Sequence, residues 1–494
     1  MTSFATPVID WHALSPEIVL VGVICLLLCV DVTLLERGRK YIAPLAGLGL
    51  LGSLIPLLTL AASDQDTRSM FNGAYVVDHR ALLLKALFIV VGYVVILLST
   101  NYVADGDYWE SEYYTLMVCS ILGMTVMASA RDLISIFVAL ELLSIPAYML
   151  AAWRKRDSSS NEAGMKYYLM GVFASAILLY GMSLLYGWSG STLLTEIGAS
   201  ISQKNSPAVT LGVIFVIIGF GFKVSAVPFH SWAPDTYEGS PTPVTAFLAV
   251  ASKAAGFVGL IQVIDFTLIG RANVMIPVVF VLSALSMTVG NLIALRQTNI
   301  VRMLAYSGIA QAGFMLAPFV AIDAVEGAVP AITNYLVLYA LTNLGAFAVV
   351  IAIARKTRSG EISSMGGMFR YAPGLTIAMT VFLVSFVGVP PFGAWYGKFG
   401  VMKVLIETQG KYSIALAVIL AINTAIAAFY YLNVAKTMWF DEVPDGDESQ
   451  VRIPSALKLA LTITAVGTIL LGVLPQILES ANDSTTVEQA VSKR

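Results

Sequence analysis

Four charged residues stand inside long apolar stretches of this sequence, where a charge is difficult to accommodate. Glu141 lies in LISIFVALELLSIPAYML, Lys223 follows GFGF, Lys253 lies well inside the next apolar stretch, and Lys398 lies in FVGVPPFGAWYGKFG. A lysine at the centre of a membrane helix costs at least ~2.5 kcal/mol on insertion scales. Residues of this kind mark proton or ion pathways, so the sequence points to charge movement through a membrane.

Glu141 and Lys223 have the right chemistry for a proton switch. A buried lysine holds its proton best when a carboxylate is close, so a lysine and a glutamate at a variable distance can bind and release a proton in turn. The alternative for Glu141 is a protonated side chain that is hydrogen-bonded to a neighbouring helix. For Lys398 the alternative is a lysine at the outer end of a helix, as Lys403 is expected to be.

The composition shows which class of protein carries these residues. Of the 494 residues, 57% are hydrophobic and 12% are charged, whereas soluble domains carry about 25% charged residues. The chain is therefore predicted to be an all-α polytopic membrane protein that lies in the lipid bilayer. The net charge of −2 gives no reason to expect a nucleic-acid partner.

Apolar stretches long enough to span a bilayer, at ~20 residues each, recur along the whole chain. We count fourteen, at 17–35, 41–61, 80–101, 112–129, 132–153, 164–188, 209–227, 242–266, 275–295, 299–319, 329–354, 373–406, 411–438 and 455–477. Pro228 follows Lys223 closely, and Pro390 and Pro391 interrupt the stretch 373–406. Because proline removes a backbone donor, spans seven and twelve are predicted to be broken helices.

The two broken spans suggest an internal repeat. Each combines an intramembrane lysine with nearby proline and glycine, and they are five spans apart. Two inverted five-helix repeats, of spans 4–8 and 9–13, would give this spacing. We therefore divide the chain into N-terminal helices with an outer hairpin (1–111), a first repeat (112–268), a second repeat (269–440) and an acidic loop with helix 14 and a polar tail (441–494).

The loops and short motifs add further expectations. Asn72-Gly73 between apolar residues is a hairpin signal, and Lys85 is close enough to a span end to reach the interface. Basic residues after spans one, five, nine and eleven fall on one face, which the positive-inside rule makes cytoplasmic, with both termini outside. These residues are Arg37, Arg39, Lys40, Arg154, Lys155, Arg156, Arg296, Arg302, Arg355, Lys356, Arg358 and Arg370.

Metal and redox sites are not expected in this chain. The three cysteines lie inside apolar stretches, where we expect reduced core residues, and the three histidines are scattered. Neither set has the spacing of an iron–sulfur site, paired haem ligands or a zinc site. These residues are Cys25, Cys29, Cys119, His12, His79 and His230.

Several motifs carry a resemblance to a known family. In chain order they are ALELLSIPAYMLAAW, EAGMKYYLMGVFASAILLYG, GFGFKVSAVPFHSWAPDTYEGSPTPVTAFLA, RMLAYSGIAQAGFML and VGVPPFGAWYGKF. The chain resembles the subunit N family of the proton-pumping NADH–quinone oxidoreductases (respiratory complex I), one of three kinds of antiporter-like subunit. The resemblance covers essentially the whole chain, and the segment from Lys223 to Phe247 is its most specific portion.

The resemblance implies a fold, a function and a set of site residues. It implies fourteen helices with inverted repeats, and proton translocation through Glu141, Lys223, Lys253 and Lys398. It implies no cofactor or metal in this chain, with NADH, FMN, iron–sulfur clusters and quinone bound by partner subunits. The neighbours would be other membrane-arm subunits, of the M and K types, in a bacterial inner membrane. A lysine at position 398 is typical of subunit N, since subunit M has a glutamate there.

The chain departs from the family at one place that matters for proton movement. Many relatives read SIAH in helix ten, where this chain reads Gly308-Ile309-Ala310-Gln311. Glutamine forms hydrogen bonds but does not carry a proton near neutral pH. If the histidine of relatives is a relay, we expect water to connect Lys253 with Lys398 here.

Two other functions use the same residues. One is a subunit of a multi-subunit sodium/proton antiporter, which shares the lysine and glutamate pattern and would co-purify with small antiporter subunits. The other is a scaffold that only completes the membrane arm. In a scaffold, substitutions in the charged row would change assembly but not the proton flux of each complex.

Overall fold

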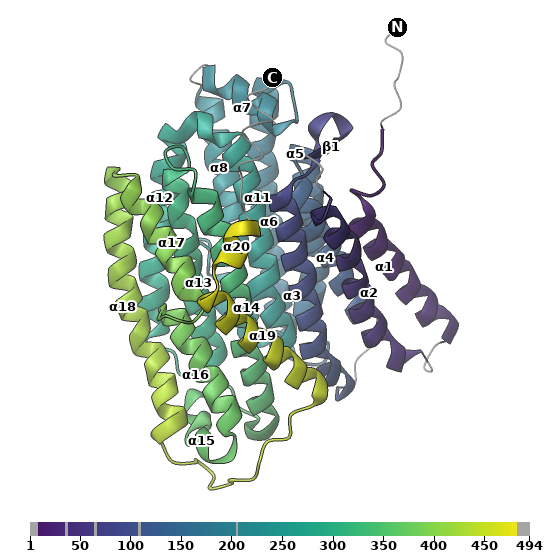
Figure 1. The fold of residues 1–494 in the computed structure, drawn as a ribbon, viewed down its shortest axis with the longest axis vertical. Coiled ribbons are helices and arrows are strands. Elements are labelled where there is room, and N and C mark those ends of the chain that lie inside the picture. The colour runs from purple at the N-terminus through teal and green to yellow at the C-terminus, as the bar shows by residue number, and fades with distance from the viewer. Residues whose placement is uncertain (1–7, 35–37, 64–66, 107–109, 204–205, 482–494) are drawn as a thin grey trace.

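Long helices packed side by side make up most of the molecule. The computed structural model describes residues 8–34, 38–63, 67–106, 110–203 and 206–481. Strand β1 (Arg68–Met70) and helix α7 (Leu194–Gln203) lie at one end, and α15 (Met368–Tyr371) lies at the other (Figure 1). Arg37 and the polar tail from residue 482 lie outside the described residues.

Every one of the fourteen predicted stretches contains helix. The continuous helices are α1 (Ser15–Leu34), α2 (Arg39–Ala61), α3 (His79–Ala104), α4 (Glu110–Ser129), α5 (Leu133–Ala151), α6 (Ser158–Ser189), α12 (Ala272–Ala294), α13 (Ile300–Leu316), α14 (Ala328–Thr357), α18 (Lys411–Phe440) and α19 (Ser455–Val473). A short helix, α20 (Gln476–Ala481), follows α19. Within the described residues, eleven helical segments are long and apolar enough to cross a membrane. The all-α membrane fold is confirmed, and the number fourteen stays a prediction.

Span seven is broken directly after Lys223. Helix α8 (Pro207–Lys223) ends there, and α9 (Trp232–Gly239) begins after eight non-helical residues. The Nε1 of Trp232 donates to the carbonyl oxygen of Phe222 at 3.1 Å. The last carbonyls of a helix have no partner within the helix, and this bond satisfies one of them. The tryptophan thereby fixes the start of α9 against the end of α8.

Span twelve is broken in the same way. Helix α16 (Pro373–Val387) ends at Gly388, whose φ of +93° is a left-handed conformation that favours glycine, and α17 (Ala394–Glu407) begins after the two prolines. The Oγ of Ser385 accepts a hydrogen bond from the backbone N–H of Ala394 at 3.1 Å. Both predicted breaks are therefore present.

Span eight has an irregularity that the sequence did not predict. A π-helical turn (Leu248–Ser252) joins α10 (Thr242–Phe247) to α11 (Lys253–Phe266). The most apolar eighteen residues of this span are all buried inside the molecule. A π turn widens the helix by one residue and is frequent at functional sites, and here it directly precedes Lys253.

The hairpin predicted around Asn72-Gly73 is also present. Strand β1 pairs antiparallel with β2 (Tyr75–Val77), so that Met70 lies opposite Tyr75. Asn72 and Gly73 both have positive φ, at 55° and 90°, which is the conformation that such turns require. The hairpin places the hydroxyl of Tyr75 next to α3.

Two expectations about single residues are wrong. Lys85 does not reach the interface: it is fully buried, its Nζ lies 3.0 Å from Oε1 of Glu17, and it donates to the Tyr75 hydroxyl at 2.9 Å. Burial raises the pKa of Tyr75 to about 12, so the phenol stays neutral and Glu17 supplies the counter-charge. Cys25 and Cys29 are exposed on α1 instead of lying in the core.

Lys85→Met is expected to destabilise the protein, because it leaves Glu17 buried without a cation. Removing one partner of a buried ion pair costs about 3–5 kcal/mol, whereas replacing both by apolar residues is often nearly neutral. The double variant Glu17→Leu/Lys85→Met is therefore the matched control. Thermal unfolding of the purified protein should place the double variant nearer to the wild type than the single variant, and the opposite order would contradict the structural role of the pair.

Candidate functional site

The four predicted residues come from four different spans. Glu141 lies on α5, Lys223 ends α8, Lys253 begins α11, and Lys398 lies on α17. The three lysines are buried, whereas Glu141 is half-buried. The carboxylate of Glu141 accepts a hydrogen bond from Ser175 Oγ at 2.6 Å.

Lys223 contacts hydroxyl groups and not a carboxylate. Its Nζ donates to Ser144 Oγ at 2.8 Å and to the Tyr167 hydroxyl at 3.3 Å. Ser144 lies about one turn after Glu141 on α5. The expected partners are therefore neighbours but not a direct ion pair, and the serine hydroxyl contacts the lysine in place of the carboxylate.

Lys253 is held by the backbone of α13. Its Nζ donates to the carbonyl oxygen of Gly308 at 2.8 Å. A Cβ at position 308 would lie 3.0 Å from this Nζ and 3.1 Å from the Tyr339 hydroxyl. The glycine therefore lets the ammonium approach the helix closely. The hydroxyls of Tyr167 and Ser252 lie 3.4 Å apart, which places a polar contact between the surroundings of Lys223 and those of Lys253.

Lys398 reaches back across the break of span twelve. Its Nζ donates to the carbonyl oxygens of Phe386 at 2.8 Å and Val387 at 3.1 Å. These carbonyls belong to the last turn of α16, where the helix dipole favours a positive charge. The ammonium also lies 4.8 Å from the ring centroid of Phe314. The expectation that Lys398 differs from Lys403 is consistent with burial, because only Lys403 is exposed.

The ammonium groups of the three lysines share one property: their hydrogen-bond acceptors are neutral. Among the residues that the structure describes, every hydrogen bond of their ammonium groups ends on a neutral oxygen, and none of them takes part in an ion pair. A buried cation without a counter-charge is costly. No contacting carboxylate fixes the charge of these three lysines, whereas Lys85 is paired directly with Glu17.

Sequence reasoning missed the hydroxyl groups around these lysines. Buried tyrosine and serine side chains contact Lys223 and lie near Lys253, and Gln311 is bonded to two further tyrosines. These residues are Ser144, Tyr167, Ser252, Ser307, Tyr335, Tyr339 and Tyr431. Tyrosines four residues apart in a predicted span, such as Tyr335 and Tyr339, were the available signal.

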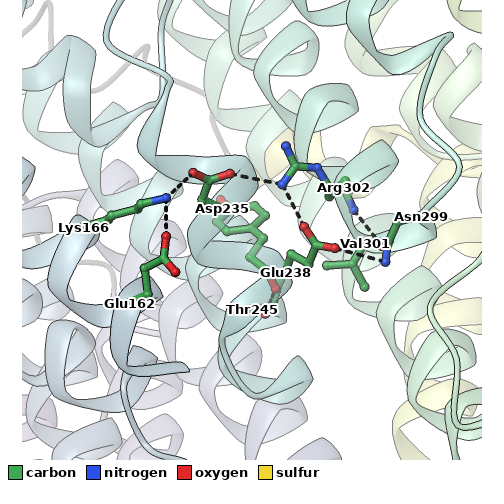
Figure 2. Close-up of polar contacts among 9 residues, drawn as sticks. Glu162, Lys166, Asp235, Glu238, Thr245, Asn299, Val301 and Arg302 are labelled. Carbon is green, nitrogen blue, oxygen red and sulfur yellow. Dashed lines mark hydrogen bonds and ion pairs between the residues drawn. The ribbon is translucent and has the colours of Figure 1, made fainter. Parts of the chain in front are cut away.

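A network of ion pairs joins α6, α9 and α13 near the ends of these helices (Figure 2). Lys166 contacts Glu162 at 2.7 Å and Asp235 at 2.8 Å, and Arg302 contacts Asp235 at 3.1 Å and Glu238 at 2.7 Å. Asp235 therefore lies between the two cations. The network connects a helix of the first predicted repeat with a helix of the second.

No metal site is formed by the described residues. Among them there is no group of three or more histidine, cysteine, aspartate or glutamate side chains that could hold a metal ion. The described cysteines Cys25, Cys29 and Cys119 are free. The titratable side chains of the row, three lysines and Glu141, can bind and release protons at nitrogen and oxygen atoms.

Comparison with known proteins places the chain among membrane subunits of one class. The family described as NADH:quinone oxidoreductase/Mrp antiporter, TM, matches residues 130–426. The chain is 39% identical over 442 residues to the NADH-quinone oxidoreductase subunit N of Heliobacterium modesticaldum, which covers 89% of this chain and 90% of that protein.

Solved structures give the same picture. A chain in the structure of respiratory complex I from Thermus thermophilus with bound aureothin has a TM-score of 0.79 and 30% identity, and the match covers 94% of this chain and 98% of that chain. A chain of the Mrp complex from Dietzia sp. has a TM-score of 0.84 at 18% identity, with 98% and 100% covered. The second similarity shows the shared fold alone.

Asp235→Asn is expected to weaken the contact between α6 and α13. Burial raises the pKa of Asp235, but hydrogen bonds from Lys166 and Arg302 outweigh burial and hold it below its ordinary value of 3.8. The stabilisation is therefore complete above that value and is lost as the pH falls through the lowered pKa. Because the pairs are partly exposed, we expect a loss of only about 1 kcal/mol near neutral pH.

Thermal unfolding at several pH values measures this effect. The difference between the wild type and Asp235→Asn should be largest near neutral pH and should vanish in strong acid. Glu162→Gln, at the most exposed arm of the network, is the matched control and should change stability less. A difference that grows as the pH falls would contradict the assignment.

Proposed function

Because the chain belongs to the NADH-quinone oxidoreductase subunit N family, we propose that it is a proton-translocating membrane subunit of such a complex. Protons cross the membrane along the row Glu141, Lys223, Lys253 and Lys398. The observation that carries this proposal is the burial of three lysines whose ammonium groups contact only neutral oxygens.

The first step occurs at the Glu141 end. Quinone reduction in neighbouring subunits changes the electrostatics near Glu141. When Glu141 no longer compensates its charge, Lys223 releases its proton towards Lys253. The half-buried position of Glu141 supports this role, since exposed apolar side chains flank it on α5 and α6 (Val138, Ile145 and Phe173). A neighbouring subunit of the M or K type would cover this face and place its own charges near the carboxylate.

The last step occurs at Lys398, which releases the proton to the outer side. A cavity of about 380 Å³ along α14 and α17 supports this direction. Its lining includes Asn334, Tyr396, Glu407 and Glu479. Of these groups, the carboxylates of Glu407 and Glu479 could take up a proton near the surface. Because the four groups of the row interact, they titrate as a coupled set.

The proposed function includes an architecture of two inverted five-helix repeats. The two broken spans share the sequence Val-Pro, then Phe, then Trp, at Val227–Trp232 and Val389–Trp395. This supports two inverted repeats, 112–268 and 269–440, after the N-terminal helices (1–111) and before the C-terminal segment (441–494). Both termini lie on the outer side of a bacterial inner membrane in this arrangement.

The redox chemistry belongs to partner subunits. NADH, FMN, iron–sulfur clusters and quinone bind there, and this chain contributes to the enzyme as its proton-translocating subunit. The similarity to a chain of the T. thermophilus complex I structure supports this division of labour. The chain itself carries the proton and binds no electron carrier.

An antiporter subunit is the second candidate, since the fold is shared with a chain of the Mrp complex. Affinity purification of the tagged chain from its native membrane separates the two. Co-purification of an NADH-oxidising quinone reductase supports the first function. Small antiporter subunits without NADH oxidation would overturn it in favour of the second.

Lys223→Ala, Glu141→Ala and Lys398→Ala are each expected to reduce proton pumping by the assembled complex. A positioned proton-transfer group contributes about 10²–10⁴-fold to its own step, so we expect a loss of roughly tenfold or more. Lys458→Ala is the control, because Lys458 is an exposed lysine on α19 that does not line the cavity along α14 and α17.

The measurement is the number of protons translocated per NADH oxidised in membrane vesicles, together with the amount of assembled complex. If all three variants pump at the wild-type level with the complex intact, the proposed pathway is wrong. If they lower assembly but leave the flux of each complex unchanged, the chain is a scaffold.

A further inference from the structure

The proposed function leaves one interval without a carrier, the interval between Lys253 and Lys398. We propose that the side-chain hydroxyls of Ser307 and Tyr431 carry the proton across this interval, and that Gln311 positions them together with Tyr335. This inference rests on the proposed function and names further residues for it. One direct hydroxyl-to-hydroxyl transfer would then replace part of the water path that the sequence led us to expect.

One face of α13 connects the two lysines. Lys253 binds the carbonyl of Gly308, and the ammonium of Lys398 lies over the ring of Phe314. Gln311 lies between these positions, about one turn from each of them. The six residues from 308 to 314 rise about 9 Å along a helix. This distance is short enough for one or two side chains to bridge.

The hydroxyl pair lies at the Lys253 end of this face. Ser307 precedes Gly308, and its Oγ shares a short hydrogen bond with the hydroxyl of Tyr431. Both side chains are fully buried. The ring of Tyr431 stacks on Phe386 at 5.4 Å between centroids, with 14° between the planes. Since the Phe386 carbonyl accepts from Lys398, Tyr431 extends from the residue beside Gly308 to the residue that holds Lys398.

Gln311 connects the two tyrosines. Its Oε1 accepts a hydrogen bond from the Tyr335 hydroxyl, and its Nε2 donates to the Tyr431 hydroxyl at 3.4 Å. The ring of Tyr335 packs on α17 at Gly397, where an added Cβ would lie 2.7 Å from it. Gly397 directly precedes Lys398. Because an amide does not take up a proton near neutral pH, Gln311 is a positioning residue and the hydroxyls are the carriers.

The transfer leaves every hydroxyl neutral. The Lys253 ammonium releases a proton, which a water molecule delivers to Ser307 Oγ. As that O–H bond forms, the original O–H bond of Ser307 breaks and its proton moves to Tyr431 Oη. Tyr431 releases its own proton in turn, through a second water molecule, to the amine of Lys398. Each bond that forms is matched by one that breaks, and rotation of the hydroxyls restores the starting state.

Tyr431→Phe tests the carrier directly, because it removes the hydroxyl and keeps the ring that stacks on Phe386. Tyr113→Phe is the matched control. Tyr113 is also fully buried, and its hydroxyl lies 3.0 Å from Ser99 Oγ, but it lies on α4 and outside the interval. Protons translocated per NADH oxidised and NADH:quinone turnover are measured in vesicles that contain equal amounts of assembled complex.

We expect Tyr431→Phe and Ser307→Ala to lower coupled turnover by roughly threefold or more. A relay group speeds its own proton-transfer step by about 10²–10⁴-fold. Turnover falls by less than this, because the step becomes rate-limiting only once the substitution has slowed it. Tyr113→Phe should keep the wild-type rate. For Gln311, Gln311→Leu should lose activity while Gln311→His, which keeps one donor and one acceptor, should retain it. Loss in both Gln311 variants alike would show a packing role and overturn the positioning assignment.

The outcomes separate this inference from the proposed function. If Lys398→Ala stops pumping while Tyr431→Phe and Ser307→Ala pump normally, the hydroxyl path is wrong and the row of lysines stands. If Glu141→Ala, Lys223→Ala and Lys398→Ala all pump normally with the complex intact, the proposed function itself fails.

Discussion

A buried ammonium group without a carboxylate is the constraint on which this structure depends. Among the described residues, three such groups lie in membrane-spanning segments. Hydroxyls on α5 and α6 stabilise Lys223, and backbone carbonyls of α13 and α16 stabilise Lys253 and Lys398. Lys398 uses the end of α16, Lys223 is the last residue of α8, and Lys253 follows a π turn. Irregular backbone at membrane depth is tolerated only where it is buried or lines a polar cavity. The break after α16 therefore supplies the polar partners of Lys398, whereas Lys223 and Lys253 find theirs on neighbouring helices.

Other buried cations in the same molecule show the contrast. Lys85 is paired with Glu17 and Arg131 with Asp78, both at about 3 Å. A paired charge is fixed, because separating it would leave its partner unpaired and buried. These pairs hold the N-terminal helices and the hairpin together. A lysine that contacts only neutral oxygens has no such partner, so its protonation can follow a change in its neighbourhood.

The sequence predicted which charged residues lie inside membrane-spanning stretches and where proline breaks a helix. An apolar stretch with one charge identifies a residue in the membrane, and Pro228 or Pro390 identifies a break. It could not predict partners, because they come from other helices. Glu141 and Lys223 were expected to pair, yet Ser144 contacts the lysine. Lys85 was expected at the interface, because its counter-charge Glu17 comes from α1, which is distant from Lys85 in the sequence. The π turn at Leu248–Ser252 leaves no residue signal at all.

The two helix breaks share a tryptophan that bonds to a backbone carbonyl and a charged residue three positions after it. In each, a tryptophan after the prolines donates its Nε1 to a backbone carbonyl, Trp232 to Phe222 and Trp395 to Gly472. The residue three positions later is charged in both, Asp235 in the first and Lys398 in the second. Asp235 lies in an exposed ion network, where it joins helices, whereas Lys398 is buried without a counter-charge. The shared sequence pattern thus places a paired charge near the surface in one break and a buried lysine without a contacting carboxylate in the other.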